Sequence, residues 1–251
     1  MKAAIKIFLL GIVDIVFPIE CFGCGFEGEW LCQKCARSLA IYENNRCPAC
    51  HADSQYGKYC SECAKDRELC GILVAGNYKN KLLEKSIKTL KYRFASSVAR
   101  ELAGLLAGFF YEQQKKILFL NTAAESVPKI ITDLQNVILV PVPLHKKRKR
   151  WRGFNQAEIL AEEFLTKIYL AYDKDNLRRL RYTKPQAGLS GDERRENLRG
   201  SFIWDGKKLD EKYIILIDDV ATTGSTLEEC AKVLKKAGAE KVTGFVLART
   251  V

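Results

Sequence analysis

Apolar residues in this chain occur either in short, nearly unbroken runs or at helical spacing, and the two kinds of segment alternate. The runs occupy residues 72–78, 137–144, 213–217 and 242–248. Segments with helical spacing occupy residues 80–92, 96–112 and 157–165, and a further one begins at Leu227 and stops at Gly238. Runs of this kind are typical of strands that are buried on both faces of a parallel sheet. Their alternation with amphipathic helices predicts an α/β fold, with a parallel sheet flanked by helices.

The run at 213–217 leads directly into two carboxylates, Asp218 and Asp219, at the end of the strand where open α/β sheets bind ligands. Small and mostly hydroxylated residues follow them: Val220, Ala221, Thr222, Thr223, Gly224, Ser225 and Thr226. A strand, a tight polar loop and a helix N-terminus form an anion site, because free N–H groups and the helix dipole face the loop. The loop has neither the spacing of a P-loop nor that of a Rossmann fingerprint.

The two carboxylates restrict the ligand of this loop. Because they would repel a phosphate placed beside them, we expect a phosphate in the loop and neutral hydroxyl groups, or a cation, near the acids. A ribose 5-phosphate fits this description, with its 2′ and 3′ hydroxyls donating to Asp218 and Asp219. The alternative interpretation is an ordinary buried strand that ends in a solvated Asp-Asp turn.

A strongly basic segment follows the run at 137–144, in the loop expected before the helix at 157–165. Six of the seven residues from 146 to 152 are basic, and the odd one is Trp151. The candidates for phosphate binding are Lys146, Lys147, Arg148, Arg150 and Arg152, followed by Gly153. Such a cluster suits a pyrophosphate or, with the aromatic ring, the phosphates and bases of single-stranded nucleic acid. A solvated charged surface is the alternative.

The segment 181–202 is polar, rich in arginine and interrupted by Gly and Pro, and a short strand is predicted at 201–204. We interpret this segment as a flap that closes over a bound ligand and excludes water. Its candidate site residues are Arg181, Thr183, Gln186, Arg194 and Asn197.

Eight of the ten cysteines occur as four C-x-x-C pairs. The pairs are Cys21 with Cys24, Cys32 with Cys35, Cys47 with Cys50, and Cys60 with Cys63. This spacing indicates two structural zinc sites of four thiolates each, and thiolates require a reducing compartment, which favours the cytoplasm. The pairs can combine sequentially, as in a double zinc ribbon, or in a cross-braced order. A redox or disulfide role is the alternative to zinc.

Charge is distributed unevenly along the chain. Residues 1–70 carry 8 Lys and Arg against 9 Asp and Glu, whereas residues 71–251 carry 33 against 21, so the net charge of +11 belongs to the later part. We therefore expect an N-terminal helix and zinc module over 1–70, and over 71–251 a domain that favours phosphorylated or polyanionic partners. The apolar stretch 3–17 is interrupted by Lys6 and Asp14 and is too short to span a bilayer, so we expect a short amphipathic helix there.

Taken together, these motifs resemble the ComF family, phosphoribosyltransferase-like proteins linked to DNA uptake in bacterial competence. The likeness covers nearly the whole chain and rests on the four cysteine pairs, L-K-Y at 90–92, P-V-P-L-H and R-G-F-N-Q within 141–156, T-K-P-Q-A-G-L-S and R-R-E-N within 181–202, I-D-D-V-A-T-T-G-S-T, and the terminal L-A-R-T. The resemblance implies a type I phosphoribosyltransferase fold that binds phosphoribosyl pyrophosphate (PRPP) with Mg²⁺. Segments 141–156, 181–202 and 218–226 then correspond to the pyrophosphate loop, the flexible hood and the PRPP loop, with Asp218 and Asp219 as the catalytic residues.

Two functions of different classes follow from this interpretation. In the first, pyrophosphate leaves C1 of PRPP and an acceptor attacks, with catalysis by positioning and electrostatics. In the second, the fold is a non-catalytic binder of single-stranded DNA that works with other DNA-uptake proteins. A glutamine-dependent amidotransferase is disfavoured, because the chain starts Met1-Lys2 and has zinc pairs in place of an N-terminal cysteine nucleophile.

Overall fold

The computed structural model describes residues 18–39, 45–92, 97–120, 133–183 and 196–250. The amphipathic helix expected at 3–17 lies outside these ranges. Within them, no helix combines the length and the apolar character that crossing a membrane requires.

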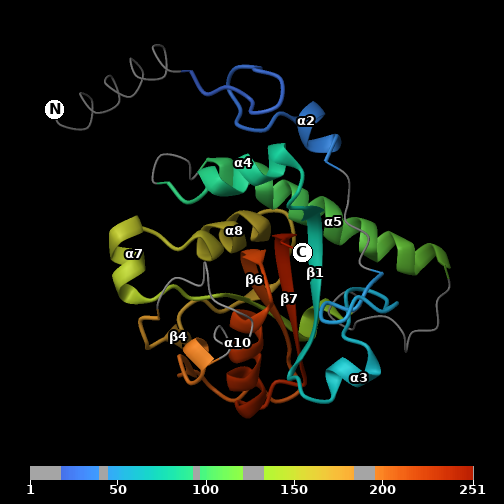
Figure 1. Ribbon diagram of the computed structural model, residues 1–251, viewed down its shortest axis with the longest axis vertical. Coiled ribbons are helices and arrows are strands. Elements are labelled where there is room, and N and C mark those ends of the chain that lie inside the picture. Colours follow the sequence, from blue (N-terminus) through green and yellow to red (C-terminus); the bar gives the residue numbers. More distant parts are fainter. Residues whose placement is uncertain (1–17, 40–44, 93–96, 121–132, 184–195, 251) are drawn as a thin grey trace.

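A five-stranded sheet forms the centre of the larger domain (Figure 1). In spatial order its strands are β1 (Leu69–Asn77), β7 (Lys241–Arg249), β6 (Tyr213–Ala221), β2 (Val137–Pro141) and β3 (Ala171–Tyr172). All of the pairings between them are parallel, so the predicted parallel sheet is confirmed. β6 lies in the middle, between β7 and β2, which explains why its first five residues are all apolar and buried.

Helices cover both faces of this sheet. The elements of one face are α4 (Lys81–Thr89), α5 (Val98–Leu120) and α8 (Gln156–Leu165), and the opposite face carries α10 (Ser225–Lys236). The side chains of β6 alternate between the two layers: Ile215 and Ile217 join the first, and Ile214 and Leu216 join the second. A small antiparallel sheet of β4 (Leu177–Arg179) and β5 (Phe202–Trp204) lies beside α10.

The basic segment at 146–152 is a helix, α7 (Lys146–Arg152), so the prediction of a loop there was wrong. The His145 side chain caps its start by accepting a hydrogen bond from the Lys147 N–H at 3.2 Å. Gly153 ends it with a φ of 91°, a conformation that glycine adopts without strain. Lys and Arg are good helix formers. The helix was missed because it has no apolar residues at helical spacing.

Other boundaries differ less from the predictions. α5 continues to Leu120, beyond the expected end at residue 112, and β6 runs through both acids to Ala221. The strand predicted at 201–204 is confirmed as β5, whereas the short strands β3 and β4 were not predicted. β1 begins at Leu69, just before the predicted domain boundary after residue 70, and that division stays a prediction.

The cysteine-rich region forms two small modules that pack on opposite faces of the sheet. The first ribbon, residues 21–35, contains the start of α2 (Gln33–Arg37) and places Leu31 in the core formed with α4 and α5. The second ribbon, residues 47–63, contains the start of α3 (Ser61–Ala64) and places Cys47 and Tyr59 in the core formed with α10. A short 3-10 helix, η3 (Leu134–Asn136), precedes β2.

The second ribbon also pairs with the outer edge of β1. The Ile72 N–H donates to the Gly57 carbonyl at 2.9 Å, and the Tyr59 N–H donates to the Cys70 carbonyl at 3.1 Å. Gly71 permits this approach, because a Cβ at that position would lie 2.4 Å from the Gly57 oxygen. The second ribbon therefore covers part of the open edge of the sheet, at residues 70–72 of β1.

Replacing Phe245 by Ala is expected to lower the free energy of unfolding by about 3–5 kcal/mol. Phe245 is fully buried and its ring centroid lies 5.9 Å from that of Phe109 and 5.7 Å from that of Phe164, so truncation leaves a cavity between β7, α5 and α8. Urea denaturation measures the change. The control is Tyr169→Ala at a side chain that is 96% exposed, where a change within about 0.5 kcal/mol is expected. Equal losses in both variants would contradict this packing.

Candidate functional site

The two acids lie at the carboxyl end of β6, as the sequence predicts. Asp219 is buried, and its Oδ2 lies 3.4 Å from the Nζ of Lys91, which follows α4. The Asp219 N–H donates to Asp218 Oδ1 at 2.8 Å, and the Val220 N–H donates to Asp219 Oδ1 at 2.9 Å. No hydrogen-bond donor among the described residues is aligned with Asp219 Oδ2, so this oxygen has only the ion pair with Lys91.

The Asp218 carboxyl has a raised pKa. Burial of its carboxyl raises its pKa well above the ordinary aspartate value, the neighbouring Asp219 raises the pKa further, and Lys91 partly lowers it. Two carboxyl groups so close cannot both ionise at low cost without a cation or several hydroxyl donors. We refer to the carboxyl end of β6, with the two acids and residues 222–226, as the crevice; it is suited to a ligand that brings one or the other.

The hydroxyl loop, residues 222–226, joins β6 to α10. Gly224 has a φ of 79° and precedes the first residue of the helix, and the hydroxyls of Thr223 and Ser225 are hydrogen-bonded to each other at 2.7 Å. The first turn of α10 thus points its N–H groups and the positive end of its dipole toward a loop of hydroxyl groups. This geometry is suited to a phosphate monoester.

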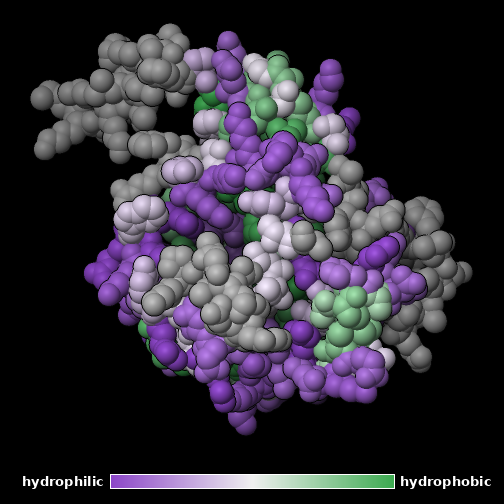
Figure 2. Space-filling view, in the orientation of Figure 1, coloured by the Kyte–Doolittle hydropathy of each residue, from purple (hydrophilic) through white to green (hydrophobic). Residues whose placement is uncertain are grey.

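The basic residues of α7 differ in their exposure to solvent. Lys146, Lys147 and Arg150 are exposed, and Figure 2 shows that this side of the molecule is strongly hydrophilic. Arg152 is partly buried: burial and the charge of Arg148 lower its pKa, and the negative charges of Asp219 and Asp218 act in the opposite direction. Arg152 also donates to Gln156, and Gly153 serves to end the helix.

The first residues of the predicted flap pack against α7. The Arg148 guanidinium donates to the Thr183 carbonyl at 3.3 Å, and Thr183 is buried. Arg181 donates to the Arg199 carbonyl at 3.0 Å, which links both ends of the segment. Asn197 lies in a helical turn before β5, whereas Gln186 and Arg194 lie outside the described residues.

Two cations near the acids were not singled out from the sequence. Lys91 was noted only within the L-K-Y motif. Arg179 of β4 is buried, donates to the Thr183 hydroxyl, and has a pKa lowered by burial and by Arg148, while Asp218 acts in the opposite direction. Both come from segments distant in sequence, so only the fold brings them to the crevice.

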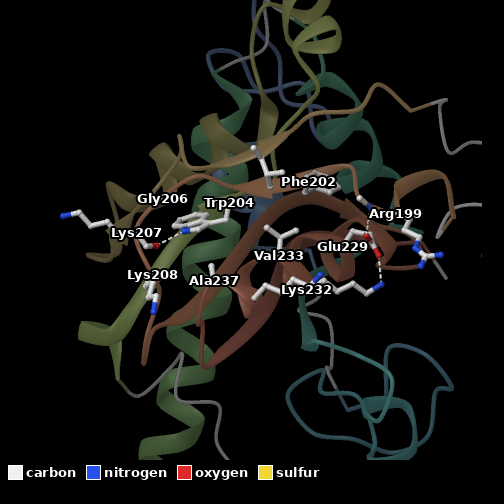
Figure 3. A pocket seen from close by; sticks show the side chains of 13 residues that line it. Arg199, Phe202, Trp204, Gly206, Lys207, Lys208, Glu229, Lys232, Val233 and Ala237 are labelled. Atoms are coloured by element: carbon white, nitrogen blue, oxygen red, sulfur yellow. Dashed lines mark hydrogen bonds and ion pairs between the residues drawn. The ribbon is translucent and has the colours of Figure 1, made fainter.

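A separate cavity of about 780 Å³ lies between β5 and α10 (Figure 3). Its lining includes Arg199, Trp204, Lys207, Lys208, Lys232 and Lys236, and it includes no residue of the hydroxyl loop. Glu229 on its wall forms an ion pair with Lys232 at 2.6 Å, and the Trp204 indole N–H donates to the Lys207 carbonyl at 2.8 Å. The cavity is basic but distinct from the crevice at the acids.

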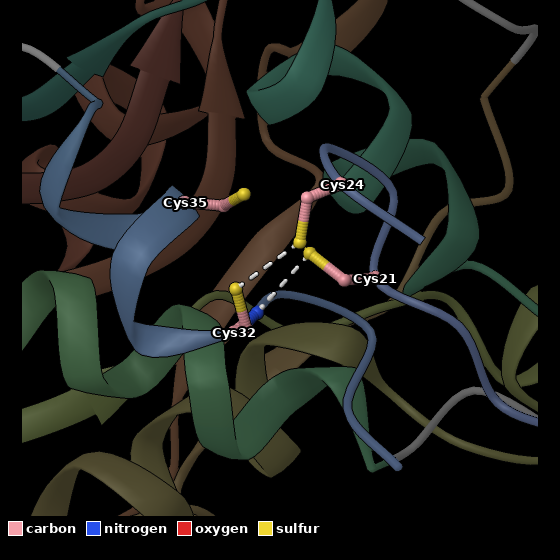
Figure 4. A group of neighbouring side chains, drawn as sticks. All are labelled: Cys21, Cys24, Cys32 and Cys35. Carbon is pink, nitrogen blue, oxygen red and sulfur yellow. Dashed lines mark hydrogen bonds between the residues drawn. The ribbon is translucent and has the colours of Figure 1, made fainter. Parts of the chain in front are cut away.

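The eight paired cysteines form two groups of four, Cys21, Cys24, Cys32 and Cys35 (Figure 4) and Cys47, Cys50, Cys60 and Cys63. The sulfur atoms within each group lie within 4.8 Å of one another, so the sequential combination is confirmed. Sγ atoms of Cys24 and Cys32, and of Cys50 and Cys60, lie 3.6 Å apart. A tetrahedral zinc with Zn–S bonds of about 2.3 Å requires about 3.8 Å. Both groups therefore fit a closed, structural zinc site.

Two family descriptions match the chain: a double zinc ribbon domain over residues 12–64 and a phosphoribosyl transferase domain over residues 151–250. Together with the parallel sheet and the acidic crevice, they define the class as a phosphoribosyltransferase-like α/β protein with an N-terminal double zinc ribbon.

The relatives specify the family. Competence protein F of Haemophilus influenzae is 30% identical over 237 residues, which cover 87% of this chain and 96% of the relative. DNA utilization protein YhgH of Escherichia coli K12 is 28% identical, covering 89% and 92%, and competence protein ComFC of Bacillus subtilis is 27% identical, covering 88% and 85%. The chain belongs to the ComF family.

Asp218→Asn is expected to stabilise the ligand-free protein, and more strongly at pH 8 than at pH 5. Below the ordinary aspartate pKa the carboxyl is protonated in both the folded and the unfolded state, so its burial carries no charge penalty. Because the folded-state pKa is raised, the penalty develops as the pH rises toward and through that value. Urea denaturation at both pH values tests this, with the exposed Asp66→Asn as control. A uniform gain at both pH values would contradict the assigned pKa direction.

Proposed function

We propose that the crevice binds PRPP together with Mg²⁺ and that the protein transfers the phosphoribosyl group to an acceptor in the handling of incoming DNA. One observation carries this proposal: the adjacent acids at the carboxyl end of β6 are followed directly by the hydroxyl loop at the N-terminus of α10. The names of the ComF relatives, which refer to competence and DNA utilization, support the setting. The thiolate zinc sites favour the reducing cytoplasm.

Each part of PRPP has a counterpart in the crevice. The 5-phosphate fits the hydroxyl loop, where amide and hydroxyl donors meet the helix dipole. The 2′ and 3′ hydroxyls would donate to Asp218 and Asp219, and Asp219 Oδ2 lacks an aligned donor among the described residues. The pyrophosphate would face Arg152 and Arg148, whose planar guanidinium groups bind phosphate oxygens in pairs.

The reaction requires little chemistry from the protein. The acceptor attacks C1 with a lone pair, the bond between C1 and the pyrophosphate oxygen breaks, and pyrophosphate leaves with the bonding electrons and takes up the proton that the acceptor releases. Asp218 and Asp219 orient the ribose, and the basic side chains stabilise the charge that develops on the leaving group. Asp218 and Asp219 are the residues that would hold Mg²⁺, which would neutralise charge on the pyrophosphate. Closure of the segment 181–202 would exclude water from the reacting carbon.

The double substitution Asp218→Asn and Asp219→Asn is expected to weaken PRPP binding by about 100-fold or more, because two charge-assisted hydrogen bonds are lost. Isothermal titration calorimetry with Mg²⁺ measures the change. Asp205→Asn, at an exposed acid, is the matched control. Arg152→Ala should weaken PRPP but not ribose 5-phosphate, because only PRPP carries a pyrophosphate. Unchanged PRPP affinity in the double variant would contradict the proposal that PRPP binds at these acids.

A second candidate function is the binding of single-stranded DNA along α7. The Trp151 side chain is 81% exposed beside exposed Lys and Arg residues, and Tyr182 nearby is 53% exposed. The Lys147 ammonium lies 5.5 Å from the Tyr182 ring centroid. Exposed aromatic rings among cations are the usual means of binding bases and phosphates without sequence preference.

Neutralising Lys146, Lys147, Arg148 and Arg150 together is expected to flatten the salt dependence of single-stranded DNA binding by about 3 in the slope of log K against log salt. Trp151→Ala should lower affinity without changing the slope, because stacking releases no counterions. Fluorescence anisotropy with a labelled oligonucleotide across a salt series measures both. The Asp218→Asn and Asp219→Asn variant should keep its DNA affinity. An unchanged slope in the neutralised variant would exclude α7 as the DNA surface.

A further inference from the structure

We propose that the second zinc ribbon positions the hydroxyl loop, through Arg249 and Tyr59, so that zinc in this ribbon sets the geometry of the ligand crevice. The consequence for ligand binding rests on the proposed function, whereas the mechanical link itself does not. The first ribbon has no corresponding role in this proposal, because it packs on the opposite face of the sheet.

Arg249 makes the first connection. It is the last residue of β7 and lies opposite Ala221 of β6 in the sheet register. Its Nε donates to the carbonyl of Thr222, the first residue of the hydroxyl loop, at 3.2 Å, and its Nη2 donates to the carbonyl of Pro48. Pro48 lies between Cys47 and Cys50, within one of the turns that holds zinc. One rigid, planar guanidinium therefore joins the zinc turn to the loop.

Tyr59 makes the second connection, from the other pair of zinc ligands. It directly precedes Cys60 and is 7% exposed. Gly224 of the hydroxyl loop faces it: a Cβ on Gly224 would lie 3.4 Å from the Tyr59 hydroxyl oxygen and 2.9 Å from Ile72 Cδ1. Gly224, which has a positive φ, therefore lies against the Tyr59 side chain of the second ribbon. Both contacts arise within two residues of a zinc ligand.

Zinc is what fixes these two contact points. A ribbon of this size has too small an apolar core to hold its turns without the metal, and metal binding supplies most of its folding free energy. Without zinc, Pro48 and Tyr59 are no longer held in place. The loop then loses the link from Thr222 through Arg249 to Pro48 and the contact between Gly224 and Tyr59. The hydroxyl loop would then sample open conformations, and ligand binding would have to restore the bound one.

The test compares two matched cysteines in the full-length protein. Cys50 in the second ribbon and Cys24 in the first are both exposed, so serine at either removes one zinc ligand with little loss of packing. Hydrogen exchange of a peptide covering residues 221–227 reports the loop without any ligand. Cys50→Ser should accelerate exchange there by about tenfold, and Cys24→Ser should leave it unchanged. Metal analysis confirms that each variant has lost zinc from one site.

Arg249→Ala provides a second variant that keeps all eight zinc ligands. It should reproduce the faster loop exchange with the zinc content unchanged, and Arg249→Lys should restore only part of the protection. Equal exchange in Arg249→Ala and the unmodified protein, or equal acceleration by Cys24→Ser, would overturn the proposal. PRPP titration with Mg²⁺ is done on the same samples. Altered exchange in the variants together with no PRPP binding by the unmodified protein would refute the proposed function alone. Normal exchange in the variants together with PRPP binding by the unmodified protein would refute only the link.

Discussion

The parallel pairing of β6 between β2 and β7 determines where the chemistry of this protein lies. Its five apolar residues are buried on both faces, so the strand cannot shift its register without exposing them. That fixed register delivers Asp218 and Asp219 to the edge of the sheet and starts the hydroxyl loop at the N-terminus of α10. The position of the site is thus set by hydrophobic burial along β6.

The crevice is built by opposing charges that the ligand-free protein balances incompletely. Lys91 forms an ion pair with Asp219, and the charges of the acids favour the protonated forms of Arg152 and Arg179, which belong to two other segments. They limit the repulsion between the carboxylates but leave Asp218 with a raised pKa. Buried charges of this kind are costly unless each one has a partner. A ligand with an anionic phosphate and hydroxyl donors would pair with the cations and donate hydrogen bonds to the acids.

Local patterns predicted the features that depend on local sequence. The strand and loop around Asp218 are contiguous, and each C-x-x-C pair is one turn, so both were evident before the fold was known. The sequential combination of the zinc pairs was one of two alternatives, because spacing does not determine which turns meet. α7 was mistaken for a loop, since its charge hid its helical propensity. Lys91 and Arg179 gave no local signal, because only tertiary packing places them at the crevice.

The pairing of the second ribbon with β1 has a consequence for solubility. β1 is the outermost strand on its side of the sheet, and residues 57–59 occupy hydrogen-bonding groups that would otherwise face solvent. An uncovered strand edge is a template for strand addition from another molecule. If zinc is what shapes this module, a cell short of zinc would leave this part of the edge open to strand addition from another molecule.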